Sequence, residues 1–223
     1  MTGIRRIIVA VLLVPVLSGV AWAQTPEETE RRRELERGIV WKRSTAAGAP
    51  TAGRLIAGVK LPPEGVNFHT WDPIRWRPVN ALDRRYATDR LIRTILRVAR
   101  EFRAAHPGAP RIVVGDMSRP RGGSFDGRYG SLREFGTRAP SGGHVSHQNG
   151  LDADVYYPRK DRRERAPGSL ADVDRQLAQD LVDRFVAAGP QFVFVGPRTG
   201  LRGQPGIVQQ LDYHHDHLHV RVR

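Results

Sequence analysis

Two short stretches of the sequence gather histidine and aspartate, the residue types that bind metal ions and transfer protons. The first, SHQNGLDAD, runs from Ser146 to Asp154 around an Asn-Gly turn, and the second, LDYHHDHLHV, runs from Leu211 to Val220. The chain contains no cysteine. Imidazole and carboxylate groups are therefore the side chains available to it for binding zinc, because a thiolate site is excluded.

Strand geometry predicts how the two stretches could meet. Successive side chains of a strand point to opposite faces, so Asp152 and Asp154 share one face, and the turn before them can fold His147 back toward it. Three histidines of the second stretch alternate in the same way, if a strand extends that far: His215, His217 and His219. A catalytic zinc ion typically has three protein ligands and an open fourth position, and it generates a nucleophile from water near neutral pH. His147, Asp154 and one terminal histidine would supply these three ligands.

Other interpretations explain less of the pattern. A single histidine or an isolated His-x-His is usually structural, and a histidine-rich tail can simply scavenge metal, but neither accounts for SHQNGLDAD. Serine catalysis is disfavoured because the chain has no Ser-x-x-Lys and no Gly-x-Ser-x-Gly motif. It also lacks a His-Glu-x-x-His motif that would supply a glutamate base. Histidine is then the available proton acceptor.

The elements that position these residues are predicted from hydrophobic periodicity. Two amphipathic helices are expected, at residues 89–105 and 171–188. Strands are expected at residues 111–116, 151–157, 191–195 and 217–222. No regular βαβ alternation appears, so we predict an α+β fold: a single domain with a small, largely antiparallel central sheet flanked by helices and long loops. A glycine-rich segment without either period, residues 119–143, predicts a long functional loop.

The N-terminal residues 1–23 have the pattern of a secretory signal peptide. A basic start, MTGIRR, is followed by an apolar run and by Ala21-Trp22-Ala23. The run is shorter than the ~20 residues that span a bilayer, so we predict cleavage before Gln24 rather than an uncleaved anchor. The mature protein would be secreted across the cytoplasmic membrane into the periplasm or cell envelope, without stable membrane insertion. Residues 24–43 would form a charged N-terminal arm, with a capping box at its start, and residues 44–223 one domain.

The formal net charge of +13 comes mostly from arginine. For a secreted protein, a cationic surface suits an anionic lipid or an anionic cell-wall polymer, or it serves only to maintain solubility. No nucleic-acid-binding module is recognisable, so no nucleic-acid partner is expected. The sequence does not indicate an oligomeric state.

Three motifs together resemble a known family. They are GDMSRPRGG from Gly115, GHVSHQNGLDAD from Gly143 and HHDHLHVR from His214. In these motifs the chain is similar to the penicillin-insensitive murein endopeptidases. These belong, with lysostaphin-type peptidases and D-alanyl-D-alanine dipeptidases and carboxypeptidases, to a wider group of zinc enzymes. The similarity is collinear from about Ser44 to the C-terminus and implies that residues 44–223 form a zinc peptidase domain.

The resemblance also implies roles for individual residues. The implied zinc ligands are His147, Asp154 and His219. His144 matches a further site histidine, which either binds the metal or lies outside its ligand shell. His217 and His214 match the catalytic histidines, and His214 could instead only orient its neighbours. Asp152 matches no ligand, and we interpret it as a supporting residue that holds a histidine tautomer.

The function implied is that of a zinc metalloendopeptidase acting on peptidoglycan. It would hydrolyse amide bonds in the peptide cross-links, D-alanyl to diaminopimelate by analogy, using a zinc-activated water with His217 as general base. Alternatives are a D,D- or L,D-carboxypeptidase or dipeptidase on stem peptides, and a non-catalytic protein that binds zinc or the cell wall. Arg119 and Arg121, next to Gly122-Gly123, are candidates for binding a substrate carboxylate, although solvated loop arginines are common.

Overall fold

The computed structural model describes residues 25–125, 133–138 and 145–223. The predicted signal peptide, His144 and, within the glycine-rich segment, residues 126–132 and 139–143 lie outside the described residues. Within the described ranges, no helix combines the length and the apolar character needed to span a membrane.

In the described ranges, three α-helices begin at side-chain caps. They are α1 (Pro26–Arg37), α2 (Asp89–Ala105) and α3 (Arg175–Ala187). The Thr88 side chain accepts a hydrogen bond from the Leu91 amide at the start of α2, as a cap must to satisfy a free amide. α3 starts later than the predicted residue 171 because Asp174 caps it in the same way, and a separate 3-10 turn, Leu170–Asp172, precedes it. Two other 3-10 turns lie at Leu82–Arg84 and Pro197–Thr199.

A seven-stranded sheet forms the centre of the described fold, in the order β12-β11-β13-β10-β7-β4-β5. Its strands are β4 (Phe68–Asp72), β5 (Arg77–Pro78), β7 (Ile112–Val114), β10 (Asp152–Tyr156), β11 (Phe192–Val195), β12 (Val208–Gln210) and β13 (His217–Arg221). Only the β4/β7 and β11/β12 pairs of this sheet are parallel. Three small pairs complete the described strands: β1 (Thr45–Ala49) with β2 (Ala52–Ile56), β3 (Val59–Lys60) with β6 (Tyr86–Ala87), and β8 (Arg133–Glu134) with β9 (Thr137–Arg138). The predicted α+β fold with a largely antiparallel sheet is confirmed.

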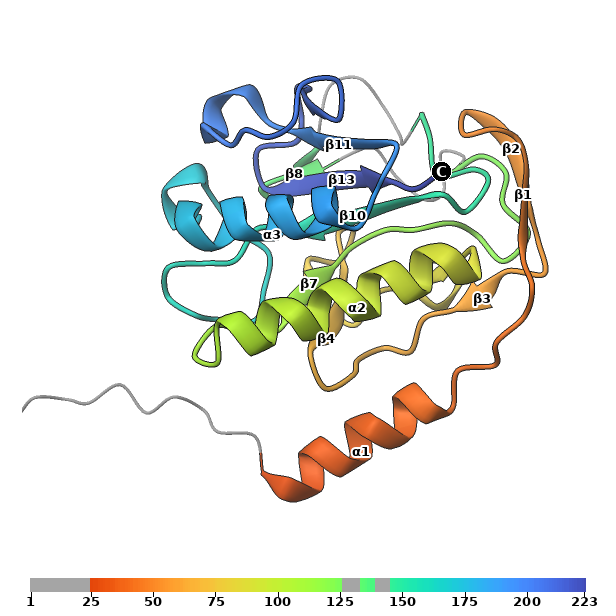
Figure 1. The fold of residues 1–223 in the computed structure, drawn as a ribbon, viewed down its shortest axis with the longest axis horizontal. Helices are drawn as coiled ribbons and strands as arrows, with labels where there is room; N and C mark the ends of the chain where they lie inside the picture. Colours follow the sequence, from red (N-terminus) through yellow and green to blue (C-terminus); the bar gives the residue numbers. More distant parts are fainter. Residues whose placement is uncertain (1–24, 126–132, 139–144) are drawn as a thin grey trace, which may run out of the picture.

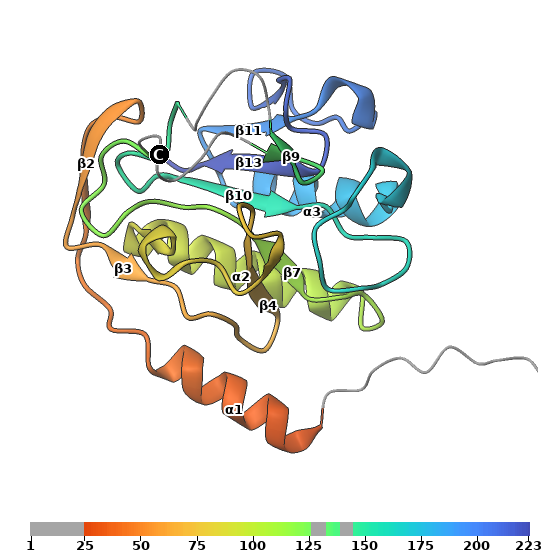
Figure 2. The same ribbon diagram turned by 180° about the vertical axis from the view of Figure 1, so that it is seen from behind.

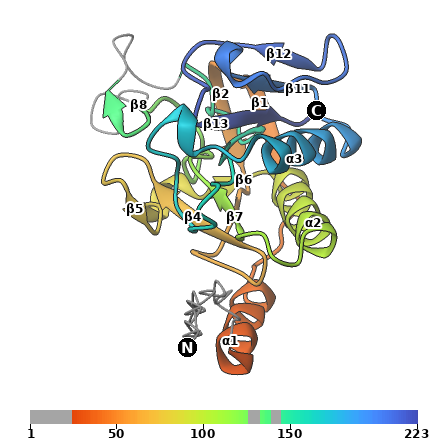
Figure 3. The same ribbon diagram turned by 90° about the vertical axis from the view of Figure 1, so that its left-hand side faces the viewer.

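The two faces of the sheet have different surroundings. Helices α2 and α3 lie side by side against one face (Figures 1 and 3), and the apolar side chains of β10 and β13 join their core. The opposite face carries the β8–β9 hairpin, seen in front of β13 in Figure 2. One face of β10 and β13 is therefore free to carry polar groups.

The charged arm forms α1, which lies apart from the sheet below α2 (Figure 1). Ion pairs attach it to the domain, because both Arg31 and Arg32 contact the Glu64 carboxylate. The Glu36 carboxylate in turn accepts a hydrogen bond from the Val66 amide. Polar contacts with residues 64–66 thus hold this helix against the domain.

Candidate metal centre and active site

The antiparallel pairing of β10 and β13 places acidic and basic side chains opposite one another. Asp154 pairs with His219, and Asp152 pairs with Arg221. His217 precedes His219 by two residues and therefore shares its face. The intervening residues of both strands are apolar and buried in the core. The alternation in the sequence thus becomes one polar face of the sheet.

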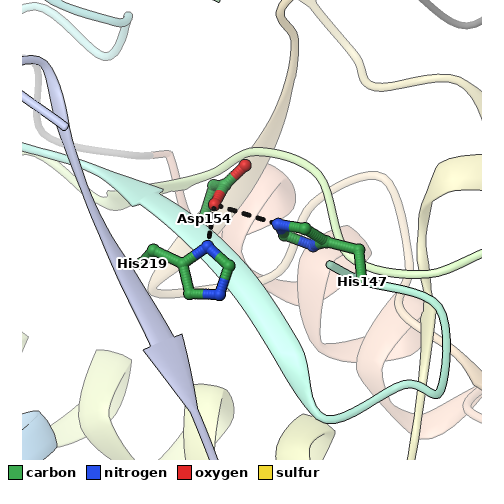
Figure 4. A group of neighbouring side chains, drawn as sticks. All are labelled: His147, Asp154 and His219. Carbon is green, nitrogen blue, oxygen red and sulfur yellow. Dashed lines mark ion pairs between the residues drawn. The ribbon is translucent and has the colours of Figure 1, made fainter. Parts of the chain in front are cut away.

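His147 reaches this face from the turn before β10. Its backbone has a φ of 69°, in the left-handed region, and Gly150 at the end of the turn has a φ of 80°. The Gly150 carbonyl accepts a hydrogen bond from the Thr88 amide, which ties the turn to the start of α2. This fold of the turn directs the His147 ring toward Asp154, as Figure 4 shows.

Among the described residues, one group of histidine and acidic side chains could hold a metal ion: His147, Asp154 and His219. Their ligand atoms lie within 4.8 Å of one another, and all three residues are buried. Asp154 Oδ1 is 3.3 Å from His147 Nε2 and 3.1 Å from His219 Nδ1. Donor atoms about 2.0–2.1 Å from a tetrahedral zinc stand about 3.3 Å apart. The donor set and these two separations fit zinc.

Asp152 fixes the tautomer of His219. Its Oδ1 lies 2.7 Å from His219 Nε2 and also accepts a hydrogen bond of 2.7 Å from Arg221 Nε. Because a carboxylate can only accept, His219 Nε2 carries a proton, which leaves Nδ1, on the side of Asp154, as the nitrogen that could bind a metal. This contact matches the supporting role interpreted for Asp152 from the sequence.

The carboxylates make the cluster favourable for positive charge. Burial alone would lower the pKa of His219, but Asp152 and Asp154 outweigh it and raise that pKa to about 9. Burial would conversely raise the pKa of Asp152, yet the hydrogen bond with His219 and nearby positive charge lower it to about 2. The pKa of Asp154 is likewise held well below its usual value, against the effect of burial, by His147 and His217. Without a metal, protons on the imidazole rings balance the negative charge of these carboxylates, and a divalent cation could replace the protons.

His217 lies beside the metal group with its two ring nitrogens in different surroundings. Nδ1 is 2.6 Å from Asp216 Oδ1, and Nε2 is 3.7 Å from Asp154 Oδ1. Nε2 is buried and makes no hydrogen bond with another described residue. The Asp216 carboxylate requires a proton on Nδ1, so Nε2 is the ring nitrogen that faces the metal group.

His214 packs against His217, with 4.9 Å between the ring centroids. Its Nδ1 donates to the Asp212 carbonyl, 2.8 Å away. Burial and the neighbouring histidine charges lower the pKa of His214 to about 2, so its ring is neutral at pH 7. The structure therefore brings His147, His214 and the β13 histidines together, whereas His144 lies outside the described residues.

His215 does not join the group, although the alternation alone would allow it. β13 begins only at His217, and the His215 ring points to other partners. Its Nδ1 donates to Glu134 Oε1, 2.6 Å away, and its Nε2 accepts from Arg198 Nε at 3.2 Å. Both ring nitrogens are occupied, which explains its absence from the metal group. Glu134 and Asp216 were not anticipated as site residues, although Asp216 directly precedes His217 in the sequence.

The glycine pair of the GDMSRPRGG motif packs against the turn that carries His147. The Gly123 amide donates to the Gln148 carbonyl at 2.8 Å, and a Cβ at Gly122 would lie 2.1 Å from the same oxygen. The pair thus supports the turn, which gives a structural reason for glycine at these two positions. Arg119 Nη1 donates to the Ser124 carbonyl, and Arg121 is exposed. Carboxylate binding by these arginines stays a prediction.

Comparison with known proteins agrees with the resemblance in the motifs. A sequence profile of the family described as penicillin-insensitive murein endopeptidase matches residues 46–186, which include His147 and Asp154 and end before β13. The chain is also similar to the penicillin-insensitive murein endopeptidase of Haemophilus influenzae, with 31% identity over 114 residues. That match covers 51% of this chain and 32% of the relative, so it extends over about a third of the relative's length.

Proposed function

The chain belongs to the penicillin-insensitive murein endopeptidase family, and we propose that it is a secreted zinc metalloendopeptidase acting on peptidoglycan. It hydrolyses amide bonds in the peptide cross-links, with the D-alanyl to diaminopimelate bond as the substrate bond. Residues 1–23 are its signal peptide, residues 24–43 its charged arm and residues 44–223 its zinc peptidase domain. The observation that carries the proposal is the buried His147-Asp154-His219 group in a chain of this family.

These three residues would hold the zinc ion. When bound, zinc supplies a Lewis acid that polarises water and the amide carbonyl. Asp152 contributes indirectly, because its hydrogen bond keeps the proton of His219 on Nε2 and leaves Nδ1 for the metal. His144 is a further candidate of this site, as a ligand or as a neighbour of the ligands.

His217 is proposed as the general base. Its Nε2 lone pair lies on the side of the metal group and can accept the proton of the attacking water. The protonated ring can then return this proton to the leaving amine, or stabilise the developing oxyanion. His214, neutral and packed against His217, assists by orienting that ring.

Metal content and product analysis together test this function. The purified protein should hold about one zinc per chain, as a three-ligand site implies, and convert cross-linked muropeptide dimers to monomers. His147→Ala should lose zinc, whereas His217→Ala should keep zinc and lose turnover. His106→Ala is the matched control, because His106 lies at the end of α2 and pairs with Asp180.

Each competing function has its own result. Release of terminal D-alanine from uncross-linked stem peptides, with dimers left intact, identifies a carboxypeptidase. A zinc-loaded wild type that binds peptidoglycan but cleaves neither substrate identifies a binding protein. A wild type that retains no zinc while it cleaves dimers contradicts the metal assignment.

A further inference from the structure

The β8–β9 hairpin, residues 133–138, is joined to the segment just before β13 by reciprocal hydrogen bonds. Glu134 of the hairpin accepts from both the backbone amide and Nδ1 of His215, at 2.8 and 2.6 Å. In the other direction, the Phe135 amide donates to Asp216 Oδ2, 2.6 Å away. Two consecutive residues, His215 and Asp216, thus bind the hairpin. His215 donates to the Glu134 carboxylate of the hairpin, and the Asp216 carboxylate accepts from the Phe135 amide of the hairpin.

Asp216 has a second partner, and this partner is the proposed base. Its Oδ1 lies 2.6 Å from His217 Nδ1, while Oδ2 accepts from the hairpin. Its backbone carbonyl accepts from the Tyr157 amide at the end of β10. The residue is fully buried, and a buried carboxylate is costly unless it is hydrogen-bonded. The fold keeps this carboxylate between a catalytic candidate and a hairpin.

The orientation of His217 depends on this contact. With its proton held on Nδ1, the ring presents the Nε2 lone pair on the side of Asp154. The opposite tautomer would place a proton on Nε2 and remove the acceptor that a general base needs. Tyr156 packs edge-on against the same ring, with 5.7 Å between centroids, which restricts its rotation.

We propose that Asp216 is a positioning residue for the reaction, which fixes the tautomer and orientation of His217 and ties both to the β8–β9 hairpin. This inference rests on the function proposed above, with His217 as the base. Asp216 acts through the imidazole and does not itself contact the substrate. The hairpin is then part of the catalytic architecture, because its Phe135 amide holds the carboxylate that holds the base.

The segment before β13 is also held through His215, which contacts both Glu134 and Arg198. His215 is fixed between the Glu134 carboxylate and the Arg198 guanidinium, so the backbone next to Asp216 is held independently of the Asp216 side chain. Loss of Glu134 therefore loosens the hairpin but leaves the Asp216–His217 contact. Loss of the Asp216 charge removes the preference of His217 for the tautomer that carries its proton on Nδ1. The two substitutions separate hairpin attachment from tautomer control.

The experiment compares Asp216→Asn, Glu134→Gln and the control Asp183→Asn, an exposed residue of α3. An asparagine amide cannot accept from both Phe135 and His217, because one of its two terminal atoms is a donor. In Asp216→Asn, zinc content stays at the wild-type level, kcat on cross-linked dimers falls about 10- to 100-fold, and KM changes less than about twofold. The Phe135 amide exchanges its hydrogen faster. Glu134→Gln lowers kcat by a smaller factor.

Nitrogen-15 shifts of the His217 ring give a readout that does not depend on turnover. The zinc-loaded wild type should carry the His217 proton on Nδ1. A wild-type proton on Nε2 overturns the inference even if Asp216→Asn fails to fold. Asp216→Asn with the kcat of Asp183→Asn also overturns it. If the wild type leaves dimers intact, the proposed function fails, and the ring shifts and Phe135 exchange still decide whether Asp216 positions His217.

Discussion

His219 Nδ1 lies 3.1 Å from Asp154 Oδ1, because the two residues are direct partners across the β10–β13 pair. Backbone pairing therefore sets the spacing of two of the three candidate zinc ligands. The third, His147, depends on a turn that packs against separate loops. The strand ligands are thus expected to tolerate substitutions in the loops better than His147 does.

Substitution of Asp152 should weaken zinc binding without removing a ligand. In Asp152→Asn, His219 Nε2–H loses its charged acceptor, so the tautomer that leaves Nδ1 for the metal is less favoured. We expect zinc affinity to fall about 10- to 100-fold. Competition with a chromophoric chelator measures it, with Asp183→Asn as control. Equal affinities for the two variants would contradict the role of Asp152.

The glycine pair offers a matched test of the support beneath His147. Both glycines have positive φ, 72° at Gly122 and 83° at Gly123, so alanine is strained at either position, at a cost of about 1–3 kcal/mol. Only at Gly122 does the new Cβ also meet the Gln148 carbonyl, since nothing lies within 4 Å at Gly123. Urea denaturation should therefore show a larger loss of stability, and zinc titration weaker binding, for Gly122→Ala. Equal losses would refute the packing argument.

Much of the site was predictable because it lies on regular strands. Alternation in the two histidine- and aspartate-containing stretches indicated the shared face, and the Asn-Gly turn indicated how His147 returns to it. The partners of His215 and Asp216 could not be predicted, since Glu134 belongs to a glycine-rich segment without helical or strand period. The attachment of α1 to the domain could not be predicted either, because ion pairs between residues distant in the sequence, such as Arg31 and Glu64, leave no periodic pattern.

Acid should weaken the attachment of α1 to the domain. Burial would raise the pKa of Glu64, but hydrogen bonds from Arg111 and Arg31 outweigh it and lower the pKa to about 2. Because the folded-state pKa lies below the unfolded value of 4.5, the ionised Glu64 carboxylate stabilises the protein above pH 4.5. This stabilisation is lost as the pH falls toward 2. We expect a loss of about 1 kcal/mol across this interval, after allowance for solvent screening. Thermal melts from pH 6 to pH 2 measure it, and Glu64→Gln should show a shallower decline than wild type. Parallel declines would exclude Glu64 as a contributor.

Inhibitors should distinguish metal from serine catalysis. The chain has no Ser-x-x-Lys motif that penicillin could acylate, so a fluorescent penicillin should not label the protein or slow dimer cleavage. A chelator should abolish cleavage, and added zinc should restore it. Covalent labelling of any serine would contradict the metal mechanism.

Zinc binding should release protons, because the ring nitrogen of His219 that faces Asp154 must be unprotonated to bind a metal. Asp152 and Asp154 raise the pKa of His219 to about 9 despite its burial. At pH 7 the metal-free ring therefore carries a proton on both nitrogens, and zinc must displace the one on Nδ1. Apparent zinc affinity should rise with pH by up to tenfold per unit for this proton and level off near pH 9.

Calorimetric titrations in two buffers of different ionisation enthalpy count the released protons. Asp152→Asn, which removes one source of the raised pKa, should release fewer protons at pH 7. Heats that are identical in both buffers would show that His219 is already unprotonated before zinc arrives.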